Sequence, residues 1–270
     1  MSLEGVHRFL TVFLRNPAMR ADILRGVSDD QLRSLGVDDP ELPLVRAIDL
    51  NVLYRSARGL ADERRGRRRQ EFTQFIDYLE QFIPMEPFWE GFEQAYPSGT
   101  LHRMEEVRRF SDYATRFLLE SPLPPFLLDL MQFNLHTTSL SEAPRVQIEG
   151  ALDDDAIGDM VLPSDEIALR EPYRVVEFRC DVIRIASQSL SQLGGPPPYQ
   201  PTTLFIQKDW SQPKTARAIP LEELPMFRHL RERALVHDRI AQFDRRLAYS
   251  LIGHLRELAH RGIIHVFRKA

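Results

Sequence analysis

The side chains best suited to chemistry are scattered along this sequence and form no familiar catalytic spacing. The eight histidines are His7, His102, His136, His229, His237, His254, His260 and His265. No two of them stand four residues apart, the spacing that puts two zinc ligands on one face of a helix. His254 and His260, six residues apart, belong to different helix faces. The histidine pattern therefore predicts no zinc-protease helix.

The single cysteine, Cys180, excludes an intrachain disulfide and any metal site built from several cysteines. It continues an alternation of Val176, Phe178 and Val182 with polar residues. This alternation predicts a half-buried strand with the thiol turned into the sheet. Because no base lies nearby in sequence, we expect the thiol to be inert.

Motifs that bind phosphates or create a nucleophile are also missing. The sequence contains no Walker loop, no glycine-rich dinucleotide pattern after a strand and no nucleophile elbow. The acidic triplet at 153–155 lacks the spacing, the glycine and the glutamate of a calcium loop. These absences favour a non-catalytic role. A stand-alone enzyme, with a site assembled from residues distant in sequence, stays an alternative.

Composition predicts a globular protein of one or two domains. Of 270 residues, 43% are hydrophobic, and the formal charge of −4 argues against a surface built throughout for nucleic acid. Val6, Phe9 and Phe13 have helical spacing interrupted by charge, unlike a signal peptide. No apolar run is long enough to span a bilayer. We therefore expect a soluble, cytoplasmic protein without a membrane partner.

The first half of the chain predicts helices that must position any functional groups. Asn16 before Pro17 is a helix cap followed by a first-turn proline, and Ser28 with Gln31 forms a capping box. A longer helix is expected from near Asp39-Pro40. It leads into DERRGRRRQ, where five arginines fall within residues 64–69. This run suits either an anionic partner or a solvated helix junction broken by Gly66, and the sequence leaves both open.

The last helix of this half follows the prolines of SPLPPFLLDLMQFNLHTTSL, residues 121–140. Its apolar residues, among them Phe126 and Phe133, cover much of the helix surface. We therefore interpret Asp129 and His136 as rim or hydrogen-bonded residues and not as catalysts.

An acidic stretch then marks the expected domain boundary. Between Val146 and Leu169 there is no lysine or arginine, and seven positions are aspartate or glutamate. Such composition is typical of a linker or an exposed excursion. We therefore predict a helical domain at 1–142, a linker or excursion at 143–171 and a second domain at 172–270.

The second domain has a mixed pattern, so the predicted fold class is α+β. TTLFIQKD and KTARAIP read as a hairpin around WSQP. Helices are expected at 221–234 and through 240–258, with a closing strand at IIHVF. The order predicts a winged helix-turn-helix-like domain with a small antiparallel sheet. Such a module binds DNA through a helix or captures a peptide on a sheet edge, and the residues alone do not separate these uses.

Several segments resemble a known family. FSDYATRFLLESPLPPFLLDLMQFNLHTTSL, EFRCDVIRI and TTLFIQKD are similar to patterns in partner proteins of multinuclear non-haem iron-dependent oxidative enzymes. These partners act in the biosynthesis of ribosomally made peptide natural products, and the length fits the TglI-like type. The resemblance covers about residues 70–265.

The resemblance implies a non-catalytic partner subunit that forms a heterodimer with the iron enzyme. Such proteins contain a recognition domain for the leader of the precursor peptide, and the enzyme holds the iron and modifies a side chain, often a cysteine. No cofactor is then expected in this chain. The alternative is a winged-helix DNA-binding transcriptional regulator, although nucleic acid is the less expected partner.

The resemblance, combined with the predicted elements, suggests two sets of site residues. The leader is expected along an edge strand near 214–219, beside a helix at 243–249. The candidate peptide-binding residues are Thr215, Arg217, Ile219, Phe243, Arg246 and Leu247. The candidate residues for docking the enzyme are Phe126, Asp129 and Phe133.

Overall fold

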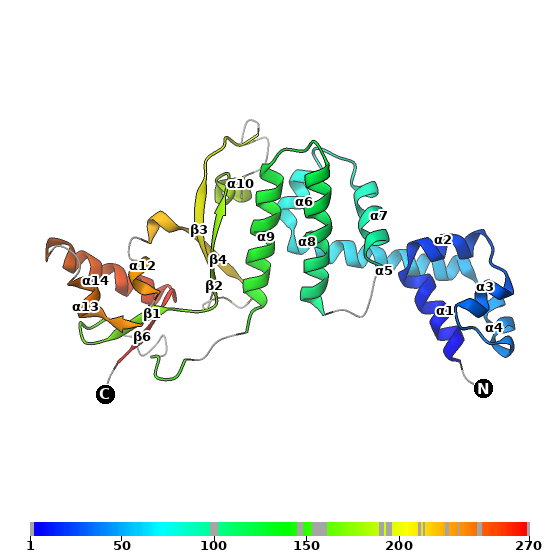
Figure 1. The fold of residues 1–270 in the computed structure, drawn as a ribbon, viewed down its shortest axis with the longest axis horizontal. Helices are drawn as coiled ribbons and strands as arrows, with labels where there is room; N and C mark the ends of the chain where they lie inside the picture. Colours follow the sequence, from blue (N-terminus) through cyan, green and yellow to red (C-terminus); the bar gives the residue numbers. More distant parts are fainter. Residues whose placement is uncertain are drawn as a thin grey trace. The chain divides into compact units, whose positions relative to one another are not determined.

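The protein is a mixture of helices and two small antiparallel sheets, as the computed structural model in Figure 1 shows. The structure describes residues 3–97, 102–144, 148–152, 161–188, 192, 196–209, 212, 214–224, 227–231, 233–241 and 245–268, with backbone only at 228, 229, 239 and 245–250. The chain divides into two compact units, Met1–Met131 and Gln132–Ala270. Within the described residues, no helix has the length and apolar character needed to cross a membrane.

The first unit is helical, as predicted. Its elements are α1 (Glu4–Arg15), α2 (Pro17–Arg25), α3 (Asp29–Ser34), η1 (Asp39–Glu41), α4 (Leu42–Arg46), α5 (Leu50–Glu71), α6 (Thr73–Leu79), α7 (Met85–Ala95), α8 (Arg103–Glu120) and the start of α9 (Phe126–Glu142). The Asn16 side chain accepts a hydrogen bond from the Met19 N–H, and Ser28 with Gln31 forms the capping box. Both predicted caps are confirmed.

The arginine run lies inside α5, which continues through Gly66, so the predicted helix junction there is wrong. All five of its arginines pair with carboxylates: Arg64 with Glu106, Arg65 with Glu86 and Glu93, Arg67 with Glu63, Arg68 with Glu71, and Arg69 with Asp77 and Glu80. Most of these carboxylates come from α6, α7 and α8. The run therefore connects α5 to its neighbouring helices through ion pairs, and these carboxylates offset its positive charge without an external anion.

The second unit carries the sheets. Its elements are the rest of α9, β1 (Glu166–Leu169), β2 (Tyr173–Phe178), α10 (Val182–Ser187), β3 (Thr202–Lys208), β4 (Ala216–Pro220), η3 (Leu221–Glu223), α12 (Phe227–Leu230), β5 (Ala234–Leu235), α13 (Val236–Ile240), α14 (Arg245–His260) and β6 (Ile264–Phe267). One sheet has the strand order β5–β1–β6 and the other β2–β3–β4. The predicted hairpin of β3 and β4 and the closing strand β6 are confirmed.

Several predicted elements differ from the structure. The single helix expected from near Asp39-Pro40 is divided into η1, α4 and α5. The helix expected at 221–234 is wrong, since the described residues there form η3, α12 and the start of β5. The apolar pattern through 240–258 is shared by α13 and α14. The segment 143–171, expected as linker or excursion, contains β1, the middle strand of a sheet. Short strands of this kind are set by pairing with distant residues, which a local pattern does not reveal.

Among the described residues, a hydrophobic core joins the two sheets of the second unit. It includes Ile167 of β1, Phe205 of β3, Ile219 of β4 and Leu255 and Leu258 of α14, all 0–3% exposed. Cys180 is also buried, although β2 ends two residues before it at Phe178. Because both sheets contribute residues to the same core, packing in that core holds the sheet β2–β3–β4 in place.

Candidate functional site

The sheet β2–β3–β4 has two outer strands whose free backbone edges can be located. The N–H of Asp209 donates to the carbonyl oxygen of Thr215 at 3.0 Å, and the N–H of Lys208 donates to that of Pro172 at 3.3 Å. In an antiparallel pair, residues that exchange hydrogen bonds alternate with residues that do not. β3 therefore bonds to β4 through its odd-numbered residues and to β2 through its even-numbered residues, following the registers of both pairs.

The outward groups follow from this alternation. On β2, the N–H and C=O groups of Tyr173, Val175 and Glu177 point away from β3. On β4, those of Ala216 and Ala218 do so, and Pro220 is next in the series without an N–H to offer. Neither outer strand is paired with a further strand of the described residues. Unpaired edges of this kind accept an additional strand from another chain.

Three of the predicted peptide-binding residues lie on β4 or just before it, and their backbone groups face β3. The Thr215 hydroxyl donates to the Gln212 carbonyl at 2.9 Å. The Arg217 guanidinium donates to the Asp209 carboxylate at 3.2 Å and to the Arg261 carbonyl just after α14. Ile219 is 3% exposed in the core. These side chains therefore support the hairpin and its packing on α14.

The other three predicted peptide-binding residues lie at the start of α14. Phe243 is outside the described residues, and only the backbone is described for Arg246 and Leu247. Their proposed place beside the edge strand stays a prediction.

The β2 edge is more exposed than the β4 edge. Arg174, Val175 and Glu177 are all exposed, and the Val175 side chain is 42% accessible. In contrast, every residue of β4 is buried or half-buried. Glu177 forms no ion pair with a described residue, so its carboxylate is available to a partner.

The α9 helix covers one face of this sheet. The Arg174 guanidinium donates to the His136 Nδ1 at 2.8 Å. Burial, together with the nearby Arg174 charge, lowers the pKa of His136 to about 4. The imidazole is therefore neutral at pH 7, in keeping with a hydrogen-bonding role. The Lys208 Nζ donates to the carbonyls of Ser141 and Ala143 at 2.6 and 2.8 Å, where its charge stabilises the end of α9.

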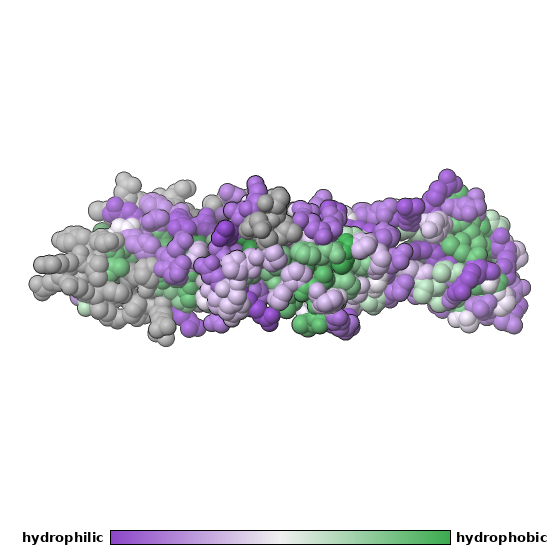
Figure 2. Space-filling view, turned by 90° about the horizontal axis from the view of Figure 1, so that it is seen from above, coloured by the Kyte–Doolittle hydropathy of each residue, from purple (hydrophilic) through white to green (hydrophobic). Residues whose placement is uncertain are grey.

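The predicted docking residues on α9 are largely internal. Phe126 is 5% exposed, with its ring 5.7 Å from that of Tyr78. Asp129 is 7% exposed. Phe133 packs its ring edge-on at 6.1 Å from Phe178 at the end of β2. A docking surface on the first unit would instead use exposed residues. Figure 2 shows that hydrophobic residues reach the surface among hydrophilic ones on the face it views.

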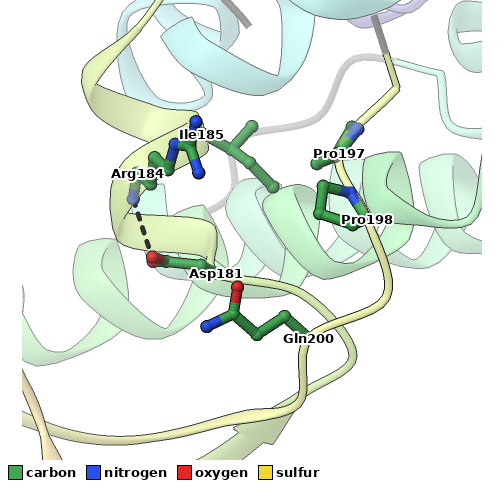
Figure 3. A pocket seen from close by; sticks show the side chains of 6 residues that line it. All are labelled: Asp181, Arg184, Ile185, Pro197, Pro198 and Gln200. Atoms are coloured by element: carbon green, nitrogen blue, oxygen red, sulfur yellow. Dashed lines mark hydrogen bonds between the residues drawn. The ribbon is translucent and has the colours of Figure 1, made fainter.

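Two hollows among the described residues differ in size. The smaller, shown in Figure 3, is lined by Asp181, Arg184, Ile185, Pro197, Pro198 and Gln200, and Asp181 caps α10 through the Arg184 N–H. The larger is a polar cleft of about 410 Å³ between α2, α5 and α7 of the first unit. The described residues include no group of three or more His, Cys, Asp or Glu side chains that could hold a metal ion.

Sequence reasoning missed the residues that shape the β2 edge. The predicted strand began at Val176 and included Glu177 but not Arg174 or Val175, and the pattern did not show that this strand is an outer one. Pairing with β3, which lies about 30 residues downstream, decides that. Neither the models of known protein families nor the curated proteins contain a match to this chain.

Proposed function

We propose that this chain is a non-catalytic partner subunit that binds the leader of a ribosomally synthesised precursor peptide and presents it to a multinuclear iron oxidative enzyme. The second unit captures the leader as an added strand, and the first unit provides the enzyme interface. The enzyme holds the iron and modifies a side chain of the peptide, for example a cysteine. The subunit contributes by raising the effective concentration of the peptide at the iron site and fixing its register.

The observation that carries this proposal is the sheet β2–β3–β4. It ends on both sides in strands whose outward backbone groups have no strand partner among the described residues. The sheet is held by α9 on one face and by the core on the other, so the edge is formed before a peptide arrives. Because the edge is already ordered, only the peptide loses conformational entropy on binding, and the total entropic cost is lower.

The resemblance described above supports the choice of partner. The length of the chain and the segments quoted in the sequence analysis are similar to those of subunits that form heterodimers with iron enzymes. The α5–α8 bundle offers a stable base for such an interface, because its arginine–carboxylate pairs and its aromatic rings fix the helices. Phe110, for example, has ring neighbours at 4.8 Å (Phe72) and 5.3 Å (Phe92).

Co-expression with a candidate multinuclear iron oxidative enzyme from the same genome tests the proposal. Size-exclusion chromatography should yield a one-to-one complex, and metal analysis should find the iron in the other subunit after separation. Elution of this chain as a separate species, with no change on adding the enzyme, would contradict the partner assignment.

A DNA-binding regulator is the second candidate, and the sheet β5–β1–β6 is the observation that favours it. The succession α12, β5, α13, α14, β6 follows the helix, strand, helix, helix, strand order of a winged helix. β1, from upstream in the chain, would take the place of the last strand. This candidate predicts binding to duplex DNA that falls steeply between about 50 and 200 mM salt. Fluorescence anisotropy with a labelled duplex separates the two functions.

A further inference from the structure

We propose that the outer edge of β2, rather than that of β4, receives the peptide and selects a segment with the order basic, any residue, apolar, acidic. This inference rests on the proposed function, since it names the strand and the sequence chemistry of the same peptide site. Two observations carry it: the difference in access between the two edges, and the side chains that β2 presents.

The β2 edge offers more backbone hydrogen bonds than the β4 edge. Tyr173, Val175 and Glu177 each turn an N–H and a C=O outward, whereas β4 turns out these groups only at Ala216 and Ala218 before reaching Pro220. Main-chain hydrogen bonds provide much of the affinity of strand addition. A peptide on β2 can therefore form the longer ladder.

Access also favours β2. Its residues 174, 175 and 177 are exposed, while the β4 side chains are buried or half-buried. Arg217 on β4 already binds Asp209 and the end of α14. A peptide at β4 would meet no exposed side chain of that strand, whereas a peptide at β2 meets a cation, an apolar residue and an anion.

The order of these side chains sets the preferred peptide sequence. Both neighbouring pairs in the sheet are antiparallel, and we take the added strand to continue that pattern. The peptide residue opposite Glu177 then comes first, the one opposite Val175 third and the one opposite Arg174 fourth. Facing residues share one side of a sheet, and opposite charges stabilise such pairs while like charges destabilise them. The matching peptide is therefore basic at the first position, apolar at the third and acidic at the fourth.

Arg174 can take part while keeping its contact with α9. One guanidinium N–H donates to His136, and a guanidinium has further donors in a planar fork that suits a carboxylate. The contact with His136 also limits the freedom of the side chain before the peptide binds.

Proline substitutions on the two edges form a matched pair of tests. Val175→Pro removes an outward N–H from β2, and Ala218→Pro removes an outward N–H from β4, while neither position bonds to β3. The probe is a fluorescein-labelled synthetic peptide of about ten residues with Lys-Thr-Val-Glu at its centre. We expect Val175→Pro to weaken binding about tenfold and Ala218→Pro to change it less than twofold. Circular dichroism of both full-length variants checks that they fold.

The outcomes separate this inference from the proposed function. Loss of binding in Ala218→Pro alone would move the peptide to β4 and overturn the choice of β2, but it would leave peptide capture intact. Binding that neither variant changes would reject strand addition itself, and with it the proposed function. Failure of the natural chain to prefer the probe over a reversed version with Glu-Thr-Val-Lys at its centre would overturn the sequence pattern.

A charge exchange tests the register more closely. We expect the natural chain to bind the peptide with Lys-Thr-Val-Glu about fivefold more tightly than the peptide with Glu-Thr-Val-Lys. The double variant Arg174→Glu with Glu177→Lys should show the opposite preference, also of about fivefold. The control Lys214→Glu changes an exposed charge beside β4 and should leave the preference unaltered. A double variant that keeps the original preference would overturn the assigned register, even if both peptides bind.

Discussion

Asp165 is a fully buried carboxylate that ties the start of β1 to the end of β6. The Arg268 guanidinium donates to both of its oxygens at 3.0 and 2.9 Å, and the Leu162 N–H donates to it at 2.7 Å. Burial alone raises the pKa of the Asp165 carboxyl, but the hydrogen bonds from Arg268 and Leu162 lower it further than burial raises it, so the pKa is below its usual range. The charged form is therefore the one that stabilises the fold.

This pairing predicts a defined dependence of stability on pH. A carboxyl whose pKa is lowered in the folded state contributes stability above its unfolded pKa, about 4, and this contribution is lost as the pH falls through the folded value. Asp165→Asn should lower the free energy of unfolding at pH 7 by about 2 kcal/mol, since Asp165 is buried while Arg268 stays partly solvated. Urea unfolding at pH 7 and pH 3 should show the difference between variant and natural chain shrinking at low pH. A constant difference would contradict this account.

His136 predicts a second pH effect, in a higher range. Its pKa of about 4 in the folded protein lies below the ordinary value of about 6.5. Protonation therefore favours the unfolded chain, so this contribution to stability is complete above about pH 6.5 and declines as the pH falls toward 4. We expect a loss of about 1 to 3 kcal/mol over that range, absent from His136→Gln. Titration of the imidazole by NMR should find no protonation at pH 6, and a midpoint near 6.5 would be inconsistent with the buried contact to Arg174.

At the scale of elements, Gln207 connects the two sheets of the second unit. It lies on β3 and is 2% exposed, and its amide N–H groups donate to the carbonyls of Arg170 and Ile263, which adjoin β1 and β6. A single buried side chain thus joins the sheet that carries the proposed peptide edge to the sheet that packs with α14.

Replacing Gln207 should loosen this connection. Gln207→Leu keeps a similar volume but removes the hydrogen bonds to the carbonyls of Arg170 and Ile263, while the Arg170 N–H still donates to the Ile263 carbonyl at 2.9 Å. We therefore expect the free energy of unfolding to fall by about 2 kcal/mol. Thr203→Val, on the same strand and only half-buried, serves as the control and should change it by less than about 1 kcal/mol. Thermal unfolding followed by circular dichroism measures both. Equal effects of the two variants would show that the amide bridge adds nothing specific.

The sequence predicted elements that depend on local signals and missed those that depend on distant partners. The caps at Asn16 and Ser28 and the hairpin of β3 and β4 follow from short patterns, and the structure confirms them. β5 has two residues and exists because Ala234 pairs with Ile167, far upstream. The local pattern around it predicts a helix instead.

The candidate site shows the same division. Local alternation indicates a strand through Val176 and Phe178, but only the pairing of β2 with β3 shows that one edge of it is open. The arginine run is comparable, because Arg64 and Arg65 pair with carboxylates 42 and 28 positions away. Charge density in a sequence does not reveal such partners.

At the scale of the whole molecule, the two units suit different tasks. The first is a set of helices fixed by aromatic packing and ion pairs, which suits a stable surface for a protein partner. The second places a preformed sheet between a helix and a core, and that sheet keeps free backbone edges. In the proposed function the first unit binds the iron enzyme and the second holds the substrate peptide.

Amide hydrogen exchange of the full chain, with and without a candidate precursor peptide from the same genome, tests the central claim most directly. An added strand ties up outward N–H groups, so the account predicts slower exchange in a segment that covers β2, with little change in α14. Unchanged exchange along both outer strands at saturating peptide would contradict capture by strand addition. Slowing confined to α14 on adding duplex DNA would favour the regulator instead.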